Sequence, residues 1–232
     1  MSTILAIETS GKYCSVALIH EGLAEFNRVD ETEMNHARAI GPFVDECVKE
    51  ARRRDWKIDA VAVSMGPGSY TGLRIGLSMA KGLCFSLNVP LIGVSTLKLI
   101  AVKAMFRNID WQGDEILVPM IDARRMEVYT AAYDFRLDAL MNPQPLILTE
   151  NSYSELTKDR DIYFMGDGSA KSKEVLKGER YHWLDGVNPK ASDMTALAEK
   201  AFREGDFLDV AYSVPEYLKD YEAKKSSVKG LS

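Results

Sequence analysis

The residues best placed to do chemistry form a glycine-rich run at residues 66–72, which reads Gly-Pro-Gly-Ser-Tyr-Thr-Gly between two apolar segments. A turn of this kind at the start of a helix can hold phosphate, because free backbone N–H groups and the helix dipole face the anion. The spacing does not fit: a Walker loop needs Gly-Lys where Thr71 and Gly72 stand, and Thr71 also interrupts Gly-x-Gly-x-x-Gly. Pro67 removes one more N–H donor. We therefore interpret the run as a tight turn that serves helix packing.

Nucleophilic and metal chemistry have little support elsewhere in the chain. Ser69 lacks the Gly-x-Ser-x-Gly context of a nucleophile elbow, because Thr71 occupies the last position. None of the three histidines, at positions 20, 36 and 182, lies four residues from another, and neither His-Glu-x-x-His nor Cys-x-x-Cys occurs. No catalytic, cofactor-binding or metal-binding residue is assigned.

The composition is that of an ordinary globular protein. The 232 residues carry 29 Lys and Arg against 34 Asp and Glu, a net charge of −5, so we expect no nucleic-acid binding by the chain alone. Its three cysteines are far apart within apolar segments, which favours free buried thiols in a reducing compartment. No apolar run is long enough to span a membrane, and the sequence predicts a cytoplasmic protein.

Apolar periodicity predicts the elements that would position these residues. In the first half, alternating residues indicate three strands joined by hairpins, and a helix, a strand, a helix, a strand and a helix follow. The predicted strands cover residues 3–10, 14–20, 23–29, 60–65 and 91–94, and the helices fall near residues 40–51, 71–88 and 96–106.

After a polar break at residues 108–113, we expect the same order of elements again. The predicted strands cover residues 116–121, 127–134, 144–148, 162–165 and 181–184, and the helices fall near residues 152–158, 170–176 and 192–204. The sequence thus predicts two similar lobes, residues 1–108 and 109–221, with the last segment of the second returning to the first. We expect residues 222–232 to be a mobile tail, since they are too polar to offset their ordering entropy.

Two copies of the order βββαβαβα are typical of the actin-like ATPase or ribonuclease H-like α/β fold, in which a nucleotide normally lies between the lobes. ATP-binding members usually carry Asp on the first strand, where this chain has Glu8, and glycine-rich hairpins, whereas residues 122–126 contain no glycine. The turn expected under the adenosine, residues 185–189, has one glycine. An independent nucleotide-dependent phosphotransferase is therefore kept as an alternative, and a peptidase as a weaker one.

Several segments resemble the TsaB family, also called YeaZ, and together they span nearly the whole chain. The most specific is GPGSYTGLRIG at residues 66–76. Met126 departs from the pattern, since many members carry glycine there. The other matching segments are ILAIETS at residues 4–10, DARRMEVY at 122–129, GDG at 166–168 and PEYLK at 215–219.

The resemblance implies a non-catalytic scaffold subunit of the bacterial machinery that installs threonylcarbamoyl on the adenosine beside the tRNA anticodon. It implies a TsaD-like catalytic partner that carries the nucleotide and metal ligands, and a TsaE-like ATPase that joins the pair. It implies tRNA contact only within the complex and no cofactor bound by this chain.

The resemblance also places the partner surface on the first two long helices. The helix near residues 71–88 is apolar over about 200° of its circumference, counting 3.6 residues per turn, whereas about 100° suffices to cover one sheet. Gly72, Gly76 and Ala80 recur every four residues and would let another helix come close. We expect a second copy to use the same patch when the chain is alone. The residues assigned to this surface are Ala37, Gly41, Val48, Gly72, Gly76, Met79 and Leu83.

Overall fold

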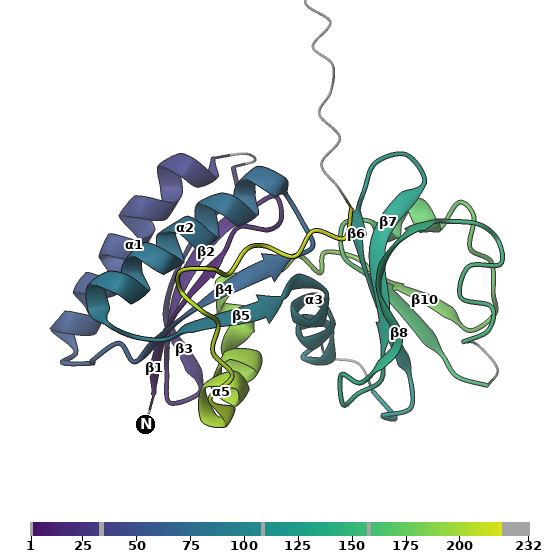
Figure 1. Ribbon diagram of the computed structural model, residues 1–232. Helices are drawn as coiled ribbons and strands as arrows, with labels where there is room; N and C mark the ends of the chain where they lie inside the picture. The colour runs from purple at the N-terminus through teal and green to yellow at the C-terminus, as the bar shows by residue number, and fades with distance from the viewer. Residues whose placement is uncertain (1, 33–34, 108–109, 157–158, 220–232) are drawn as a thin grey trace, which may run out of the picture.

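The computed structural model describes residues 2–32, 35–107, 110–156 and 159–219, which form two lobes built on one five-stranded sheet each (Figure 1). The strand order of the first sheet is 3-2-1-4-5, with the first strand parallel to the fourth and antiparallel to the second. Its strands are β1 (Thr3–Glu8), β2 (Cys14–His20), β3 (Leu23–Asp30), β4 (Ala60–Gly66) and β5 (Leu91–Ser95).

Helices cover both faces of this sheet because its central strands are apolar on both sides. On β1, Leu5 and Ile7 pack with the helices of one face, and Ile4 and Ala6 pack with those of the other. The first face carries α1 (His36–Arg53) and α2 (Tyr70–Leu87). The second face carries α3 (Thr96–Met105), the 3₁₀ turn η1 (Ala191–Met194) and α5 (Thr195–Glu204).

The second sheet repeats the topology of the first. Its strands are β6 (Ile116–Asp122), β7 (Glu127–Tyr133), β8 (Ala139–Ile147), β9 (Ile162–Met165) and β10 (Tyr181–Leu184), in the order β10-β9-β6-β7-β8. Helix α3 lies between the lobes and packs on β6, β7 and β9 as well as on the first sheet (Figure 1). The predicted two-lobed α/β fold is therefore confirmed.

The second lobe has less helix than the sequence pattern predicts. A helix was expected at residues 152–158, of which 157–158 lie outside the described residues. Residues 152–156 form turns, because Tyr153 adopts a left-handed backbone (φ 72°) that ends any regular helix. The next helix, α4 (Ser169–Ser172), has four residues and is shorter than expected. Helix α5, by sequence order the last helix of the second half, packs against β5 of the first sheet.

Beyond α5 the chain forms a C-terminal strap, which we define as residues 206–219. The strap crosses the first lobe toward the β6–β7 hairpin (Figure 1). At its start Leu208 N–H donates to the Leu91 carbonyl at 2.8 Å, and at its end the Lys219 ammonium lies 3.0 Å from the Glu127 carboxylate. The strap therefore touches both lobes.

Two of the sequence-based predictions fall outside the described residues. The boundary after residue 108 lies on the pair 108–109, and the tail at residues 222–232 lies beyond residue 219, so both stay predictions. Over the ranges that the structure does describe, no helix is both long and apolar enough to cross a membrane. The three cysteines, at positions 14, 47 and 84, are buried free thiols, as expected.

Candidate functional site

The glycine-rich run forms the turn from β4 into α2, and its glycines make room for neighbouring backbone. A Cβ atom on Gly68 would lie 2.5 Å from the Ser10 carbonyl oxygen, and one on Gly72 would overlap the Thr9 carbonyl oxygen. Ser69 is the N-cap of α2, and its hydroxyl accepts a hydrogen bond from the Gly72 N–H at 3.2 Å. The interpretation of this run as a packing turn is therefore confirmed.

Gly66 is needed for a different reason, because the C-terminal strap passes directly over it. Its φ of +120° is a conformation that only glycine adopts easily. A Cβ there would lie 2.6 Å from the Glu216 carbonyl oxygen. The Glu216 N–H also donates to the Met65 carbonyl at 2.7 Å. The start of the glycine-rich turn is therefore the place where the strap packs on the first lobe.

Glu8, at the end of β1, is fully buried, and its carboxylate contacts Ser10 two residues further on. Its Oε1 accepts hydrogen bonds from the backbone N–H and the hydroxyl of Ser10, both at 2.5 Å. Its Oε2 has no hydrogen-bond partner among the residues that the structure describes. Burial raises the pKa of Glu8 to about 7, and the two Ser10 bonds only partly oppose this effect. Glu8 thus caps local backbone at the end of β1.

A cleft of about 860 Å³ lies between the lobes. It is bounded by the turn at residues 10–12, the start of α2, the β6–β7 hairpin and the end of the strap. Four cationic side chains line it together with four acidic ones, so it has no net positive charge to attract phosphates. These side chains are Lys12, Arg124, Arg125 and Lys219, and Asp122, Glu127, Asp167 and Glu216.

The residues of this cleft do not fit the usual nucleotide site. Glu8, which stands where the metal-holding Asp would be, is buried and does not line the cleft. The hairpin that would approach phosphates through glycine carries Arg124 and Arg125, both at positive φ. Within the ranges that the structure describes, no three His, Cys, Asp or Glu side chains gather where they could hold a metal ion.

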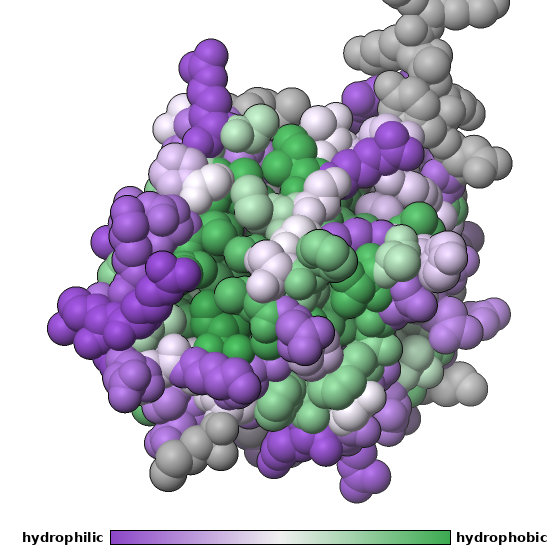
Figure 2. All heavy atoms as spheres, turned by 60° about the vertical axis from the view of Figure 1, so that its left-hand side comes forward, coloured by the Kyte–Doolittle hydropathy of each residue, from purple (hydrophilic) through white to green (hydrophobic). Residues whose placement is uncertain are grey.

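The second surface feature is a groove of about 780 Å³ on the outer face of α1 and α2. Figure 2 shows hydrophobic side chains gathered on this side of the molecule, with hydrophilic ones around them. Apolar side chains make up most of its lining. Ser78 and Gly82 also line it, and both are small, exposed residues of α2. The apolar residues of the groove include Ala37 and Ile40 of α1 and Ile75, Met79 and Leu83 of α2.

The seven residues assigned to the partner surface fall into three groups in the structure: those that line the groove, those that are half-exposed outside it, and those that are buried. Ala37, Met79 and Leu83 line the groove. Gly41 and Val48 are half-exposed on α1 but do not line it.

Placing Gly72 and Gly76 on the exposed side of α2 was wrong. Both glycines are buried, and a Cβ on either would overlap Thr9 at the end of β1. They let α2 approach β1 closely, and they are unavailable to a partner.

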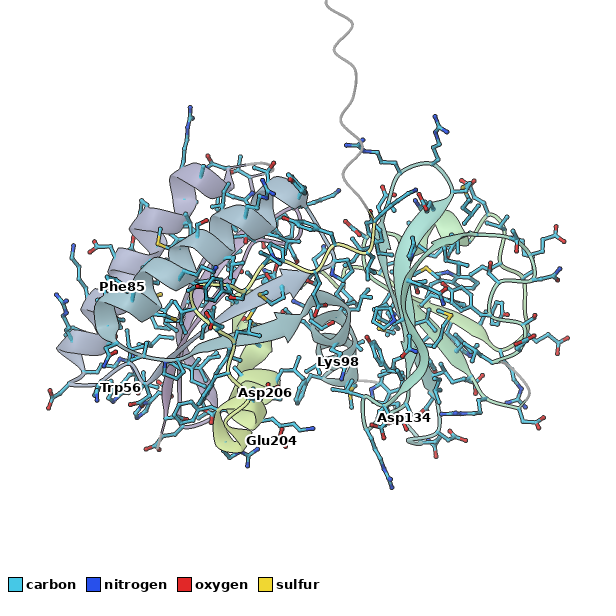
Figure 3. The ribbon with its side chains drawn as sticks, in the orientation of Figure 1. Trp56, Phe85, Lys98, Asp134, Glu204 and Asp206 are labelled. Carbon is cyan, nitrogen blue, oxygen red and sulfur yellow. The ribbon has the colours of Figure 1, made fainter. Side chains whose placement is uncertain are left out.

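A signal for the correct side was present in the sequence. In an α-helix, residues that are two positions apart in the sequence point in directions about 200° apart. Gly76 therefore points away from both Arg74 and Ser78. Arg74 and Ser78 are exposed and mark the outer side of α2, on which Gly82 also lies. Phe85 continues this side toward the end of α2 and is 86% exposed (Figure 3). The small residues that could let another helix come close on the outer side of α2 are therefore Ser78 and Gly82.

Two lobes with the same five-stranded topology define the protein as a member of the actin-like ATPase fold class. Residues 30–227 match the model of the family described as "TsaD: tRNA N6-adenosine threonylcarbamoyltransferase". The chain is 30% identical to the tRNA threonylcarbamoyladenosine biosynthesis protein TsaB of Bacillus subtilis and 31% identical to that of Escherichia coli. Each alignment covers 96% of both chains. The chain belongs to the TsaB (YeaZ) family.

The solved structures agree with this assignment. YeaZ from Pseudomonas aeruginosa superimposes with a TM-score of 0.76 at 30% sequence identity. The match covers 94% of this chain and 100% of that one. The resemblance seen in the five sequence segments is therefore confirmed over nearly the whole length.

Proposed function

We propose that this protein acts in tRNA threonylcarbamoyladenosine biosynthesis as a non-catalytic subunit, whose groove on α1 and α2 binds and activates a TsaD-like catalytic subunit. The observation that carries the proposal is the groove itself, because soluble proteins seldom leave a contiguous apolar face of two helices uncovered. The match of residues 30–227 to the TsaD family supports a partner of the same fold.

The shape of the groove suits a helix. A Cβ on Gly82 would meet nothing within 4 Å, so this position of the groove is open to solvent. A partner helix that crosses at Ser78 and Gly82 can approach to the short end of the usual 8–10 Å spacing. Ile75, Met79 and Leu83 would then pack against its apolar side chains.

The interlobe cleft supports a role without catalysis. Its balanced charges, the buried Glu8 and the arginine-bearing hairpin are poorly suited to nucleotide chemistry. In this proposal the catalytic groups belong to the TsaD-like partner, and tRNA is contacted only within the complex. A TsaE-like ATPase would join the pair.

Gly82→Arg tests the groove directly. The new side chain enters open space, so the fold is retained, but it would hold a partner helix away and would be costly to desolvate. Co-purification and calorimetry with the TsaD-like protein of the same organism should show that binding is abolished. The matched control is Ala196→Arg, which adds the same charge at an exposed position of α5.

The consequences for activity and self-association follow from the same variant. Gly82→Arg should abolish tRNA modification in the reconstituted system, and it should dissolve any homodimer formed through the groove. Unchanged partner affinity in a folded Gly82→Arg protein would place the interface elsewhere.

The alternative, an independent phosphotransferase, predicts a nucleotide site in the cleft. Calorimetric titration of the isolated chain with ATP and Mg²⁺ separates the two functions. We expect no binding heat and no turnover by the single component. Tight binding that is lost on substitution of Glu8 would favour the alternative.

A further inference from the structure

Arg74 stands apart from the rest of the groove. It is exposed, and it is the one charged side chain among the described residues that line the groove. Its position on the outer side of α2, one turn before Ser78, places it on the path of any helix that packs there. A partner that fills the groove must therefore meet this cation.

The guanidinium of Arg74 is held in place from two sides. Its central carbon lies 4.2 Å from the centre of the Tyr70 ring. Its Nε donates a hydrogen bond to the Tyr217 hydroxyl at 3.0 Å. The rings of Tyr70 and Tyr217 lie 5.0 Å apart and support each other. Tyr217 belongs to the strap, so two segments far apart in the sequence fix one side chain.

The two outer nitrogens of Arg74 have no hydrogen-bond partner within the part of the chain that the structure describes. Arginine has a planar fork of donors that matches a carboxylate in a bidentate pair. If a partner covered this cation with apolar groups alone, the desolvation cost would weaken the complex. Since Arg74 is already ordered, little side-chain entropy is lost when an anion binds.

We propose that Arg74 is the specificity-determining contact of the groove and that it receives a carboxylate from the helix that docks there. This inference rests on the proposed function, because it assigns the chemistry of the partner at the same surface. Tyr70 and Tyr217 are positioning residues, which hold the guanidinium with its outer nitrogens free. A helix with an apolar face but no acidic residue at this point would bind poorly.

The test uses three variants of Arg74 and measures affinity for the TsaD-like subunit at low and high salt. Arg74→Met removes the charge and should weaken binding by about ten- to a hundredfold, the range of an interface hot spot. Arg74→Glu should weaken it further, because two carboxylates would then face each other. Arg74→Lys keeps the charge without the fork and should fall between wild type and Arg74→Met.

Salt dependence separates a charge contact from a packing effect. Affinity of the wild type should fall as salt rises, and Arg74→Met should lose most of this dependence. The matched control is Arg52→Met, which removes an exposed arginine at the far end of α1 and should change neither quantity. Tyr217→Phe should weaken binding by less than Arg74→Met.

The outcomes distinguish this inference from the proposed function. If Gly82→Arg abolishes binding while Arg74→Met and Arg74→Glu bind like wild type, the carboxylate contact is refuted and the groove stands. If Gly82→Arg has no effect, the proposed function itself fails. Equal losses for Arg74→Met and Arg74→Glu, with salt dependence unchanged, would also refute the charge contact.

Discussion

Gly76 of α2 lies directly against Thr9, so that a Cβ on Gly76 would overlap the Thr9 hydroxyl oxygen. That hydroxyl is buried and makes no hydrogen bond within the described part of the chain. The contact brings α2 close to the end of β1 and fixes which side of the helix faces the sheet. The opposite side, which carries Gly82, is left for a partner.

Alanine at these two glycines should have opposite effects. Gly76→Ala should destabilise the protein by about 1–3 kcal/mol, because the methyl group forces α2 away from Thr9. Gly82→Ala should stabilise it by about 0.5–1 kcal/mol, since alanine has the higher helix propensity and meets no neighbour. Urea unfolding of both variants measures the difference. Similar free energies of unfolding would show that Gly76 does not face the sheet.

Glu8 should make stability depend on pH. Its pKa of about 7 in the folded protein exceeds the ordinary value of 4.5, because burial disfavours the charged form. The folded state therefore holds the proton more tightly, and stability should fall as pH rises between these two values. One pH unit corresponds to about 1.4 kcal/mol, so the whole loss is on the order of 3 kcal/mol.

Glu8→Gln removes the titration and keeps the shape of the side chain. In chemical unfolding from pH 4.5 to pH 8, this variant should show a flatter profile than the wild type. Parallel profiles for the two proteins would mean that Glu8 titrates normally.

The cysteine thiols should be unreactive in the folded protein. Burial raises the pKa of Cys14 and Cys47 to about 12 and that of Cys84 to about 11, so thiolate is scarce at pH 8. A thiol reagent should label them only as fast as the protein opens. Ser86→Cys, exposed on the same helix as Cys84, should react at once and serves as the positive control. Rapid labelling of the wild type would contradict this burial.

Apolar contact should hold the C-terminal strap more firmly than its ion pair does. Leu208 packs against Gly93, whereas the pair of Lys219 with Glu127 is partly exposed and worth about 1 kcal/mol or less. Limited proteolysis should therefore cut the strap faster in Leu208→Ala than in Lys219→Ala. Equal cleavage rates would indicate that the charge at the end of the strap matters as much as its apolar start.

The strands could be predicted closely because their alternating apolar residues follow the faces of the sheets. For β2 and β10 the predicted and observed limits agree, at residues 14–20 and 181–184. Of the helix expected at residues 152–158, the described residues 152–156 form turns for an identifiable reason. Tyr153 and Leu156 have helical spacing, but Tyr153 reaches the core from a turn and donates its hydroxyl to Thr130 at 3.0 Å.

The site was predicted only in part, because its location depends on contacts between distant segments. Helix α2 is apolar around most of its surface, so periodicity alone did not show which side packs against the sheet. In the structure the side that carries Gly76 packs against Thr9. The link from Arg74 to Tyr217 spans 143 positions, and no local pattern reveals it.

Helix α5 has a consequence for synthesis of the chain on the ribosome. One face of the first sheet packs against residues from the far end of the sequence. Ala191, Met194 and Ala198 join a core formed otherwise by residues 4–99, and Leu197, Ala201 and Phe202 pack against it. A nascent chain that has already made all five strands of this sheet still has that face uncovered. The first lobe can close only after residues from the far end of the sequence have left the ribosome exit tunnel. Translation that stops early therefore yields a chain with a large exposed apolar surface. Such a chain is prone to aggregate and can be recognised by quality-control proteases.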